Sequence, residues 1–336
     1  MVEIQAFAKI NIGLTVFGRQ PSGYHDIEGI FQNVDIADLL TLSIVEQPGI
    51  VIRGDLGCPA ERSSVYQAIV AFQRACGARL EGSGIEASVI KRIPSGAGLG
   101  GAGADAAATI LGLDRLFDTK LTRSELANIG ACIASDVPFF IYGGAAVVRG
   151  RGEYIDPIQP RQDFGVLVIK PSWDSKTPEA YSELDTLRKK GLLQELPIER
   201  RFGDHWCVSK TTAALVAEYK NPIDTWTFQN DFETVLREKH REYTSLYEIM
   251  RQCGANFVSM SGSGSCFYGI FASKTDAVEA AIRFRELLKS GAKSALLPTT
   301  GIFATQPLAR SMKVRYIQGC SEDTRSDKER PCYGSD

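Results

Sequence analysis

The 336-residue sequence predicts an α+β fold made of two domains. Three observations support this prediction. Residues 2–16 alternate between apolar and polar side chains with the period of a β-strand. A glycine-rich stretch joins a second strand-like run, residues 85–93, to an alanine-rich helix. In the second half, helical segments alternate with short apolar strands, a pattern typical of helices packed on an antiparallel sheet.

Composition and charge limit the classes of function. The sequence is 44% hydrophobic and 23% charged, as is usual for a globular protein, and its formal net charge of −2 argues against nucleic acid as the main partner. No apolar run is long enough to span a membrane, and we expect no signal peptide. The eight cysteines are scattered without the CxxC or Cys/His spacing of a zinc site. We therefore expect reduced thiols in a cytoplasmic protein that is a monomer or homodimer.

The first strand has an unusually regular pattern. Every even-numbered position from Val2 to Val16 is apolar, whereas odd-numbered positions include Lys9 and Asn11. This period of two predicts one buried face and one polar face, with Lys9 and Asn11 on the polar side. A turn over residues 18–23 then leads to Tyr24 and His25.

Local signals define the other elements of the first half. Ser63 or Ser64 suits the start of a helix that ends near Gly77. Thr122 and Glu125 have the spacing of a capping box for a helix that runs to about residue 133. Further strands are expected at residues 27–34, 39–45 and 50–53, and a strand pair with turn glycines is expected after residue 144. The domain boundary is placed near residues 156–160, which gives a first domain of residues 1–156.

The second half predicts a domain of residues 157–304. Strands are expected at residues 165–170, 257–260, 266–271 and 302–303, and helices at residues 178–190, 210–219, 231–252 and 276–289. After about residue 304 the chain is polar and mixed in charge. Residues 305–336 are therefore predicted to form a disordered tail.

The stretch Lys91–Leu113 is the most informative part of the sequence. Between Gly96 and Gly103, five of eight residues are glycine and two are alanine, and a helix is expected to begin near Ala104. Glycines allow the backbone to approach a ligand closely, and a helix N-terminus adds free N–H groups and a positive dipole end. Together these features predict a binding site for a polyphosphate.

Other interpretations of this loop were compared with the phosphate site. A glycine-rich turn between a strand and a helix can simply allow close packing. Gly96-x-Gly98-x-x-Gly101 matches the dinucleotide fingerprint, but the second strand that this fingerprint requires is missing, because a polar turn and another helix follow. No Lys-Ser or Lys-Thr follows the last glycine, as a P-loop requires, and the His-Arg-Asp signature of protein kinases is absent. A structural loop and the phosphate loop of a small-molecule kinase remain.

Four ordered motifs resemble those of the GHMP kinase superfamily. Pro94–Gly101 resembles its P-x-x-x-G-L-G-G phosphate loop, and Ala8–Leu14 resembles its first motif. Ser135–Phe140, followed by two glycines, is similar to the block that contains the catalytic aspartate, and Ser261–Gly264 is similar to the third motif. The resemblance spans about residues 4–304. It implies an N-terminal domain like ribosomal protein S5, a ferredoxin-like C-terminal domain and an active site between them.

Within this superfamily, the sequence is most similar to the members that use ATP to phosphorylate the 2-hydroxyl of 4-diphosphocytidyl-2-C-methyl-D-erythritol in non-mevalonate isoprenoid biosynthesis. Further motifs that support this similarity are Gly23-Tyr24-His25, Gly150-Arg151-Gly152-Glu153, Thr177-Pro178 and Asn230-Asp231. The similarity implies a small-molecule substrate, a cytidine diphosphate derivative, with ATP and Mg²⁺ as cofactors.

The resemblance also implies roles for individual residues. Asp136 matches the residue that takes the proton from the substrate hydroxyl, and Lys9 matches the lysine beside it. A positioned general base contributes about 10²–10⁴-fold, and a cation keeps such a carboxylate ionised. The nucleotide phosphates would lie on the loop residues Pro94, Ser95, Gly96, Ala97, Gly98, Leu99, Gly100, Gly101, Ala102, Gly103 and Ala104.

The acceptor side of the site is implied in the same way. Tyr24 and Tyr181 match two aromatic residues that clamp the cytosine ring, and His25 matches the residue that reads the cytosine edge by hydrogen bonding. Stacking contributes about 1–3 kcal/mol per base. Asn11 and Thr177 complete the expected substrate contacts.

One departure from the family pattern concerns the metal. Where the superfamily usually has two serines, this sequence has Gly103 and Ala104, so the loop is expected to hold phosphate through main-chain N–H groups alone. Asp105 is then the nearest carboxylate for Mg²⁺ or its waters, or else a cap of its own helix. Two other functions stay open: a kinase of another small alcohol, such as a sugar or mevalonate derivative, and a non-catalytic ligand sensor on the same fold.

Overall fold

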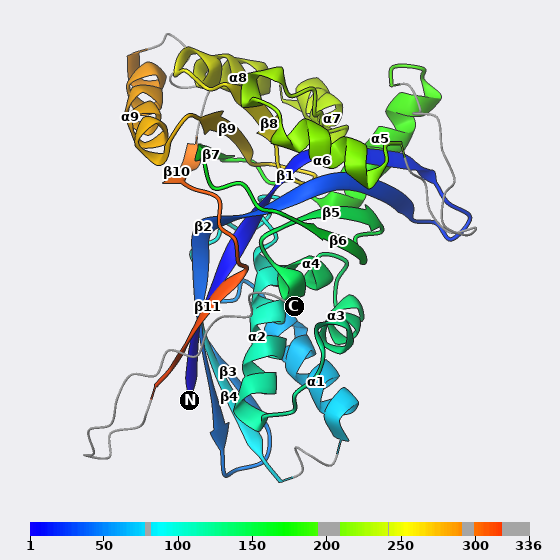
Figure 1. Cartoon of the computed structure of the whole chain (residues 1–336), viewed down its shortest axis with the longest axis vertical. Helices are drawn as coiled ribbons and strands as arrows, with labels where there is room; N and C mark the ends of the chain where they lie inside the picture. The colour runs from blue at the N-terminus through cyan, green and yellow to red at the C-terminus, as the bar shows by residue number, and fades with distance from the viewer. Residues whose placement is uncertain (78–81, 194–208, 241, 291–298, 318–336) are drawn as a thin grey trace.

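The computed structural model describes residues 1–77, 82–193, 209–240, 242–290 and 299–317, and these residues form two sheets with helices packed on them (Figure 1). The first sheet has the order β11-β1-β2-β4-β3, with β5 paired to β2 and β6 paired to β5. The second sheet has the order β10-β7-β9-β8. Within the described part of the chain, no helix is long and apolar enough to cross a membrane.

The strands of the first sheet are β1 (Val2–Arg19), β2 (His25–Val45), β3 (Ile50–Arg53), β4 (Gly84–Ile90), β5 (Ala145–Gly150), β6 (Tyr154–Ile158) and β11 (Met312–Tyr316). Its helices are α1 (Ser64–Cys76), α2 (Gly101–Phe117), α3 (Arg123–Ala131) and α4 (Val137–Tyr142), with a 3₁₀ turn at Ala60–Arg62 before α1. The second sheet contains β7 (Gly165–Pro171), β8 (Phe257–Met260), β9 (Phe267–Phe271) and β10 (Thr299–Thr305). Its helices are α5 (Thr177–Lys189), α6 (Thr212–Lys220), α7 (Phe232–Lys239), α8 (Glu242–Gln252) and α9 (Lys274–Ser290), with a 3₁₀ turn at Ile223–Thr225.

The predicted helix caps of the first half are confirmed. The Ser63 side chain accepts a hydrogen bond from the backbone N–H of Tyr66 at the start of α1, and Gly77 ends this helix with φ 51°. Thr122 and Glu125 form both halves of the capping box of α3. These caps satisfy the N–H groups that a helix start leaves without intrahelical partners.

The helix behind the glycine loop begins three residues earlier than the sequence predicted, at Gly101 rather than near Ala104. Its small residues allow close packing on the first sheet. A side chain at Gly112 would lie 2.6 Å from Ile4 of β1, so the helix backbone approaches the sheet closely there. The second half of α2 therefore packs closely against β1 and β2.

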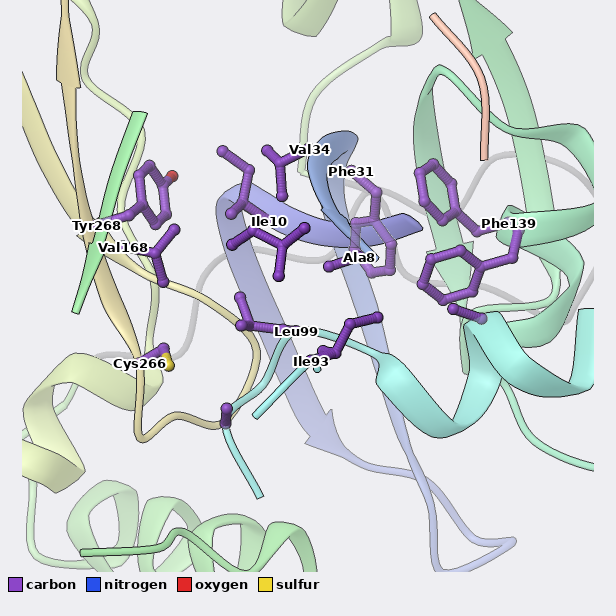
Figure 2. Packing of buried hydrophobic residues seen from close by; sticks show 14 of the residues in the cluster. Ala8, Ile10, Phe31, Val34, Ile93, Leu99, Phe139, Val168, Cys266 and Tyr268 are labelled. Atoms are coloured by element: carbon purple, nitrogen blue, oxygen red, sulfur yellow. The ribbon is translucent and has the colours of Figure 1, made fainter. Parts of the chain in front are cut away.

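The prediction of a polar face on β1 is wrong for its central part. Lys9 is only 5% exposed and Asn11 is fully buried. The second sheet packs over this part of β1, because the hydroxyl of Tyr268 on β9 donates a 2.8 Å hydrogen bond to the carbonyl of Asn11. Figure 2 shows Tyr268 and Val168 on one side of Ile10 and Phe139 on the other, within one hydrophobic cluster. Even- and odd-numbered side chains of residues 6–12 are all buried, so both faces of the central part of β1 are covered.

Two other element predictions differ from the structure. The expected strands 27–34 and 39–45 are one continuous strand, β2. The expected helix 231–252 is divided into α7 and α8, since His240 leaves the helical region with φ −123° and ψ 91°. Its N–H still bonds to Leu236, which closes the last turn of α7. The composition of this segment contains no glycine or proline that would have signalled the break.

The prediction of a disordered tail from residue 305 is wrong for Met312–Tyr316. These residues form β11, which pairs antiparallel with β1 from Val2 to Ala6. Met312 and Val314 pack on the core while Lys313 and Arg315 alternate with them, so the strand has the period of two that an edge position requires. The chain thereby returns from the second sheet to the first (Figure 1). Residues 305–311 are also ordered, with Thr305 in β10 and Pro307 bridged to Val34, whereas residues 318–336 of the predicted tail lie outside the described residues.

Removing residues 311–317 tests the contribution of β11. A variant that ends at Arg310 should unfold with a free energy about 2–4 kcal/mol lower than one that ends at Ile317, because it loses the β1–β11 ladder and the bond from Phe7 N–H to the Ser311 carbonyl. Chemical denaturation of the two variants measures this difference. Equal free energies of unfolding would contradict a stabilising role for β11.

Candidate active site

A cavity of about 620 Å³ lies where the two sheets meet. It brings together residues that are far apart in the sequence and that the motifs had singled out. Its walls include Lys9, Asn11, Pro94–Gly103, Asp105, Asp136, Thr177, Tyr181 and Gly262–Gly264. The cavity therefore combines the glycine loop, the two charged residues and the C-terminal glycine turn in one site.

The carbonyl groups of the glycine loop are bound to the protein. The Gly96 and Ala97 carbonyls accept hydrogen bonds from the N–H groups of Ser265 and Cys266, and the Leu99 carbonyl accepts one of 3.0 Å from Lys9 N–H. Glycines at 96, 98 and 100 have φ between 61° and 74°, which only glycine adopts readily. The N–H groups at the start of α2 have no intrahelical partners, so this end of the loop suits an anion.

Lys9 lies beneath the loop, on β1. Its ammonium group donates hydrogen bonds to the Gly98 carbonyl (2.8 Å) and to the Asn11 side-chain oxygen. Burial lowers the pKa of Lys9 to about 8, and the charge of Asp136 partly opposes this shift. The lysine is therefore a cation that is held in place and that titrates much closer to neutrality than a lysine in water.

Asp136 is half-buried and directly precedes α4. Burial raises its pKa above the ordinary value, and the Lys9 charge opposes that shift. Its carboxylate lies against Gly103 in the first turn of α2, where a Cβ atom would stand 2.6 Å from the carboxyl carbon. Gly103, one of the two positions where the family has serine, thus provides the space that this carboxylate occupies.

Asn11 connects the loop, Lys9 and the C-terminal domain. Its side-chain oxygen also accepts hydrogen bonds from Gly262 N–H (2.7 Å) and the Ser261 hydroxyl (3.2 Å). Among the described residues its amide Nδ2 is buried without a hydrogen-bond partner. Asn230, which the Asn-Asp motif had marked, fixes the same turn by donating to the Met260 and Gly262 carbonyls.

The predicted aromatic clamp is not assembled in the structure. Tyr181 lines the cavity, but its ring stacks on His25 at 4.8 Å rather than facing Tyr24. His25 in turn bonds through Nε2 to Asp185 on α5, at 2.8 Å. Tyr24 is 58% exposed, and its ring lies under the guanidinium of Arg151. Of the aromatic pair, only Tyr181 is at the cavity wall.

Asp105 is not a helix cap, because Gly100 is the N-cap residue of α2. One of its oxygens accepts a 2.6 Å hydrogen bond from Lys91, which also binds Asp38. Burial raises the pKa of Asp105 to about 7. Within the described residues, no group of three or more His, Cys, Asp or Glu side chains is placed to hold a metal ion. The described part of the chain therefore offers no cluster in which Asp105 would be a metal ligand.

Several residues of the cavity were not singled out by the sequence. The predicted residue Thr177 lines the cavity and forms a 3.0 Å hydrogen bond with the Ser263 hydroxyl. Its neighbour Ser175, which was not predicted, lines the cavity as well. Residues 56–62, before α1, gave no signal because they form no motif. The lining residues that the sequence did not single out include Leu56, Cys58, Arg62, Val65, Gln67, Ser175 and Phe232. Ser63, Ser64, Lys91 and Arg151 also line the cavity, and they were noted in the sequence only as a cap or as parts of motifs.

Comparisons with known proteins agree with this arrangement. The GHMP kinases N terminal domain matches residues 63–144, and the GHMP kinases C terminal domain matches residues 218–290. With both matched domains and a glycine-rich loop, a lysine and an aspartate in one cavity, the chain is a small-molecule kinase and belongs to the GHMP kinase family.

Curated relatives and a solved structure narrow the comparison. The 4-diphosphocytidyl-2-C-methyl-D-erythritol kinase of Thermodesulfovibrio yellowstonii is 35% identical over 286 residues, which cover 85% of this chain and 95% of that protein. The enzyme of the same name from Treponema pallidum strain Nichols is 34% identical and covers 80% of this chain and 90% of its own length. A crystal structure of 4-(cytidine 5'-diphospho)-2C-methyl-D-erythritol kinase matches with a TM-score of 0.69 and 29% identity, covering 91% of this chain and 98% of the other.

More distant structures share the fold alone. A homoserine kinase from Cytophaga hutchinsonii has a TM-score of 0.66 at 17% identity, with 94% of this chain and 97% of the other covered. The mevalonate kinase of L. major has a TM-score of 0.61 at 16% identity, with 91% and 95% covered.

Replacing Gly103 with alanine tests the contact between α2 and the aspartate. The new Cβ would displace the Asp136 carboxylate, and a shift of about 1 Å costs roughly 10²-fold in rate. We expect kcat to fall about 10²-fold while the affinity for ATP and the melting temperature change little. Ala131→Ser is the matched control, since Ala131 is an exposed residue at the end of α3 and does not line the cavity. A Gly103→Ala variant with unchanged kcat would contradict this role.

Proposed function

We propose that the chain transfers the γ-phosphoryl group of ATP to the 2-hydroxyl of 4-diphosphocytidyl-2-C-methyl-D-erythritol, in the non-mevalonate route to isoprenoid precursors. The main support is the placement of Lys9 and Asp136 beside the glycine loop, in a chain that is 35% identical to a kinase of that name over 85% of its length.

The glycine loop is the ATP side of this proposal. Its carbonyls are turned into the protein by bonds to β1 and to residues 265–266, so the phosphates meet N–H groups and the positive end of α2. This arrangement needs no side-chain hydroxyl, which accounts for Gly103 and Ala104 in place of serines.

Asp136 is the general base. It accepts the proton of the acceptor hydroxyl while the hydroxyl oxygen bonds to the γ-phosphorus and the bond to the ADP oxygen breaks. Lys9 neutralises charge on the transferred group and keeps Asp136 ionised despite its burial. Asn11 holds Lys9, and its Nδ2 is the donor that it has left for a substrate group.

The acceptor occupies the side of the cavity formed by α5. Tyr181 provides the aromatic face for the cytosine, and His25, fixed by Asp185 and stacked on Tyr181, is the base-edge reader. Thr177, bound to Ser263, borders the same region. Tyr24 lies outside this stack, so a two-sided clamp requires its ring to move towards Tyr181.

Mg²⁺ is proposed as the counter-ion of ATP. The described residues contain no cluster of metal-binding side chains, and Asp105 is bound to Lys91. These residues do not fit a protein-bound metal site. The ion would therefore enter on the phosphates with its waters, as Mg²⁺ commonly does.

Purified protein with ATP, Mg²⁺ and 4-diphosphocytidyl-2-C-methyl-D-erythritol should release ADP, and Asp136→Asn should lower kcat by about 10²–10⁴-fold. ADP release in a coupled assay measures both. The Glu61→Gln variant is a control, since this carboxylate lies on the 3₁₀ turn before α1 and does not line the cavity. ATP binding without turnover in the wild type would favour a ligand sensor, and a near-normal rate for Asp136→Asn would exclude it as the base.

The rate should depend on pH at both ends. Activity requires Asp136 ionised and Lys9 protonated, so kcat/KM falls on the acid side as the carboxylate, with its raised pKa, takes up a proton. It falls again above about pH 8 as Lys9 loses its proton. Lys9→Arg should move the alkaline limb upward, because arginine stays charged. An alkaline limb that stays near pH 8 in Lys9→Arg would contradict the assignment to Lys9.

A further inference from the structure

Arg151 is a cavity cation with no role in the mechanism above. It follows β5 in the Gly-Arg-Gly-Glu turn, lines the cavity, and its side chain is 53% exposed. Its guanidinium lies 5.0 Å from the centre of the Tyr24 ring, a cation–π distance. Glu153 is its nearest carboxylate, with 3.8 Å between Nε and Oε1. The guanidinium is therefore oriented by an aromatic ring, and its contact with Glu153 is too long for a strong hydrogen bond.

The turn that contains Arg151 lies between two parts of the site, the general base Asp136 and the region proposed to bind the acceptor. Gly150 pairs with Ile27 near the start of β2, which places the next residue beside Tyr24. Gly152 has φ 120°, and a Cβ there would lie 2.7 Å from the carbonyl oxygen of Ser135, the residue before Asp136. Arg151 thus lies between the residue before the catalytic base and an aromatic residue of the acceptor region.

The other cations of the cavity differ from Arg151 in their surroundings. Lys9 lies under the loop beside Asp136, and Lys91 is bound by two carboxylates. Arg62 enters from the segment before α1. Among the described cavity residues, Arg151 is the cation that contacts Tyr24. The acceptor brings a diphosphate between its cytidine and its erythritol, and a diphosphate requires a cation on that side.

We propose that Arg151 binds the diphosphate of the acceptor and that Tyr24 holds its guanidinium in position. The inference rests on the proposed function. A guanidinium fork matches two phosphate oxygens, and stacking on an aromatic face limits the freedom that it loses on binding.

The test compares ligands that differ only in phosphate. Cytidine, CMP and CDP are titrated by calorimetry into wild type, Arg151→Ala and Arg151→Lys, with the ATP site filled by a non-hydrolysable ATP analogue. We expect Arg151→Ala to weaken CDP binding about 10- to 100-fold and cytidine binding less than about twofold, since only CDP has the charge to bind. Arg151→Lys should recover part of the loss, because lysine keeps the charge but not the guanidinium fork.

Arg283→Ala on α9 is the matched control, since Arg283 has a similarly exposed side chain (59%) and lies outside the cavity. It should leave all three affinities unchanged. Equal affinities of wild type and Arg151→Ala for CDP, or an equal loss for cytidine and CDP, would overturn the inference. If wild type prefers CDP to cytidine and phosphorylates the full acceptor, such a result leaves the proposed function intact. A wild type that neither binds CDP nor turns over overturns both.

Discussion

The burial of Lys9 between the two sheets is the constraint on which the site depends. A buried ammonium group is costly unless its hydrogen bonds are satisfied, and here the Gly98 carbonyl and the Asn11 side chain satisfy them. Asn11 also binds the turn at Ser261–Gly262. The contacts that offset the free-energy cost of burying Lys9 therefore also join the glycine loop to the C-terminal domain. The position of Lys9 and the packing of the two domains thus depend on one set of interactions.

The two charged groups depend on each other. Burial shifts the pKa of Lys9 down and the pKa of Asp136 up, and each charge opposes the shift of the other. Because the pair is coupled, its titration belongs to both residues. A carboxylate with a raised pKa is a better proton acceptor at neutral pH than an ordinary one, while the nearby cation keeps it ionised.

Glycines set the distances in this site, each for its own reason. At Gly98 a Cβ would overlap the Ser261 carbonyl, so the glycine allows the loop and the turn to touch. At Gly103 it would overlap the Asp136 carboxylate, so the glycine allows this carboxylate to approach the helix. The sequence indicates a phosphate loop through its glycine content, but only the packing explains why each position is glycine.

The sequence by itself determined what depends on neighbouring residues. The strand period of residues 2–16, the cap at Ser63, the capping box at Thr122 and the order of the motifs are short-range signals, and they predicted the elements and the cavity residues Lys9, Asp136 and Thr177. Periodicity, however, does not show which element covers a face of a strand. It also did not reveal β11, because this strand lies in a segment that is polar overall.

Tertiary structure decided the pairings that join distant residues. The polar side chain of Asn11 on β1 became part of an interface because the Ser261–Gly262 turn binds it. Asp105 was bound by Lys91 from the preceding strand end, and Tyr24 met Arg151 rather than Tyr181. Each outcome depends on contacts and burial created when the two sheets come together, and these have no local signature in the chain. The motifs predicted the kind of chemistry, and the packing of the two sheets determined the geometry of the site.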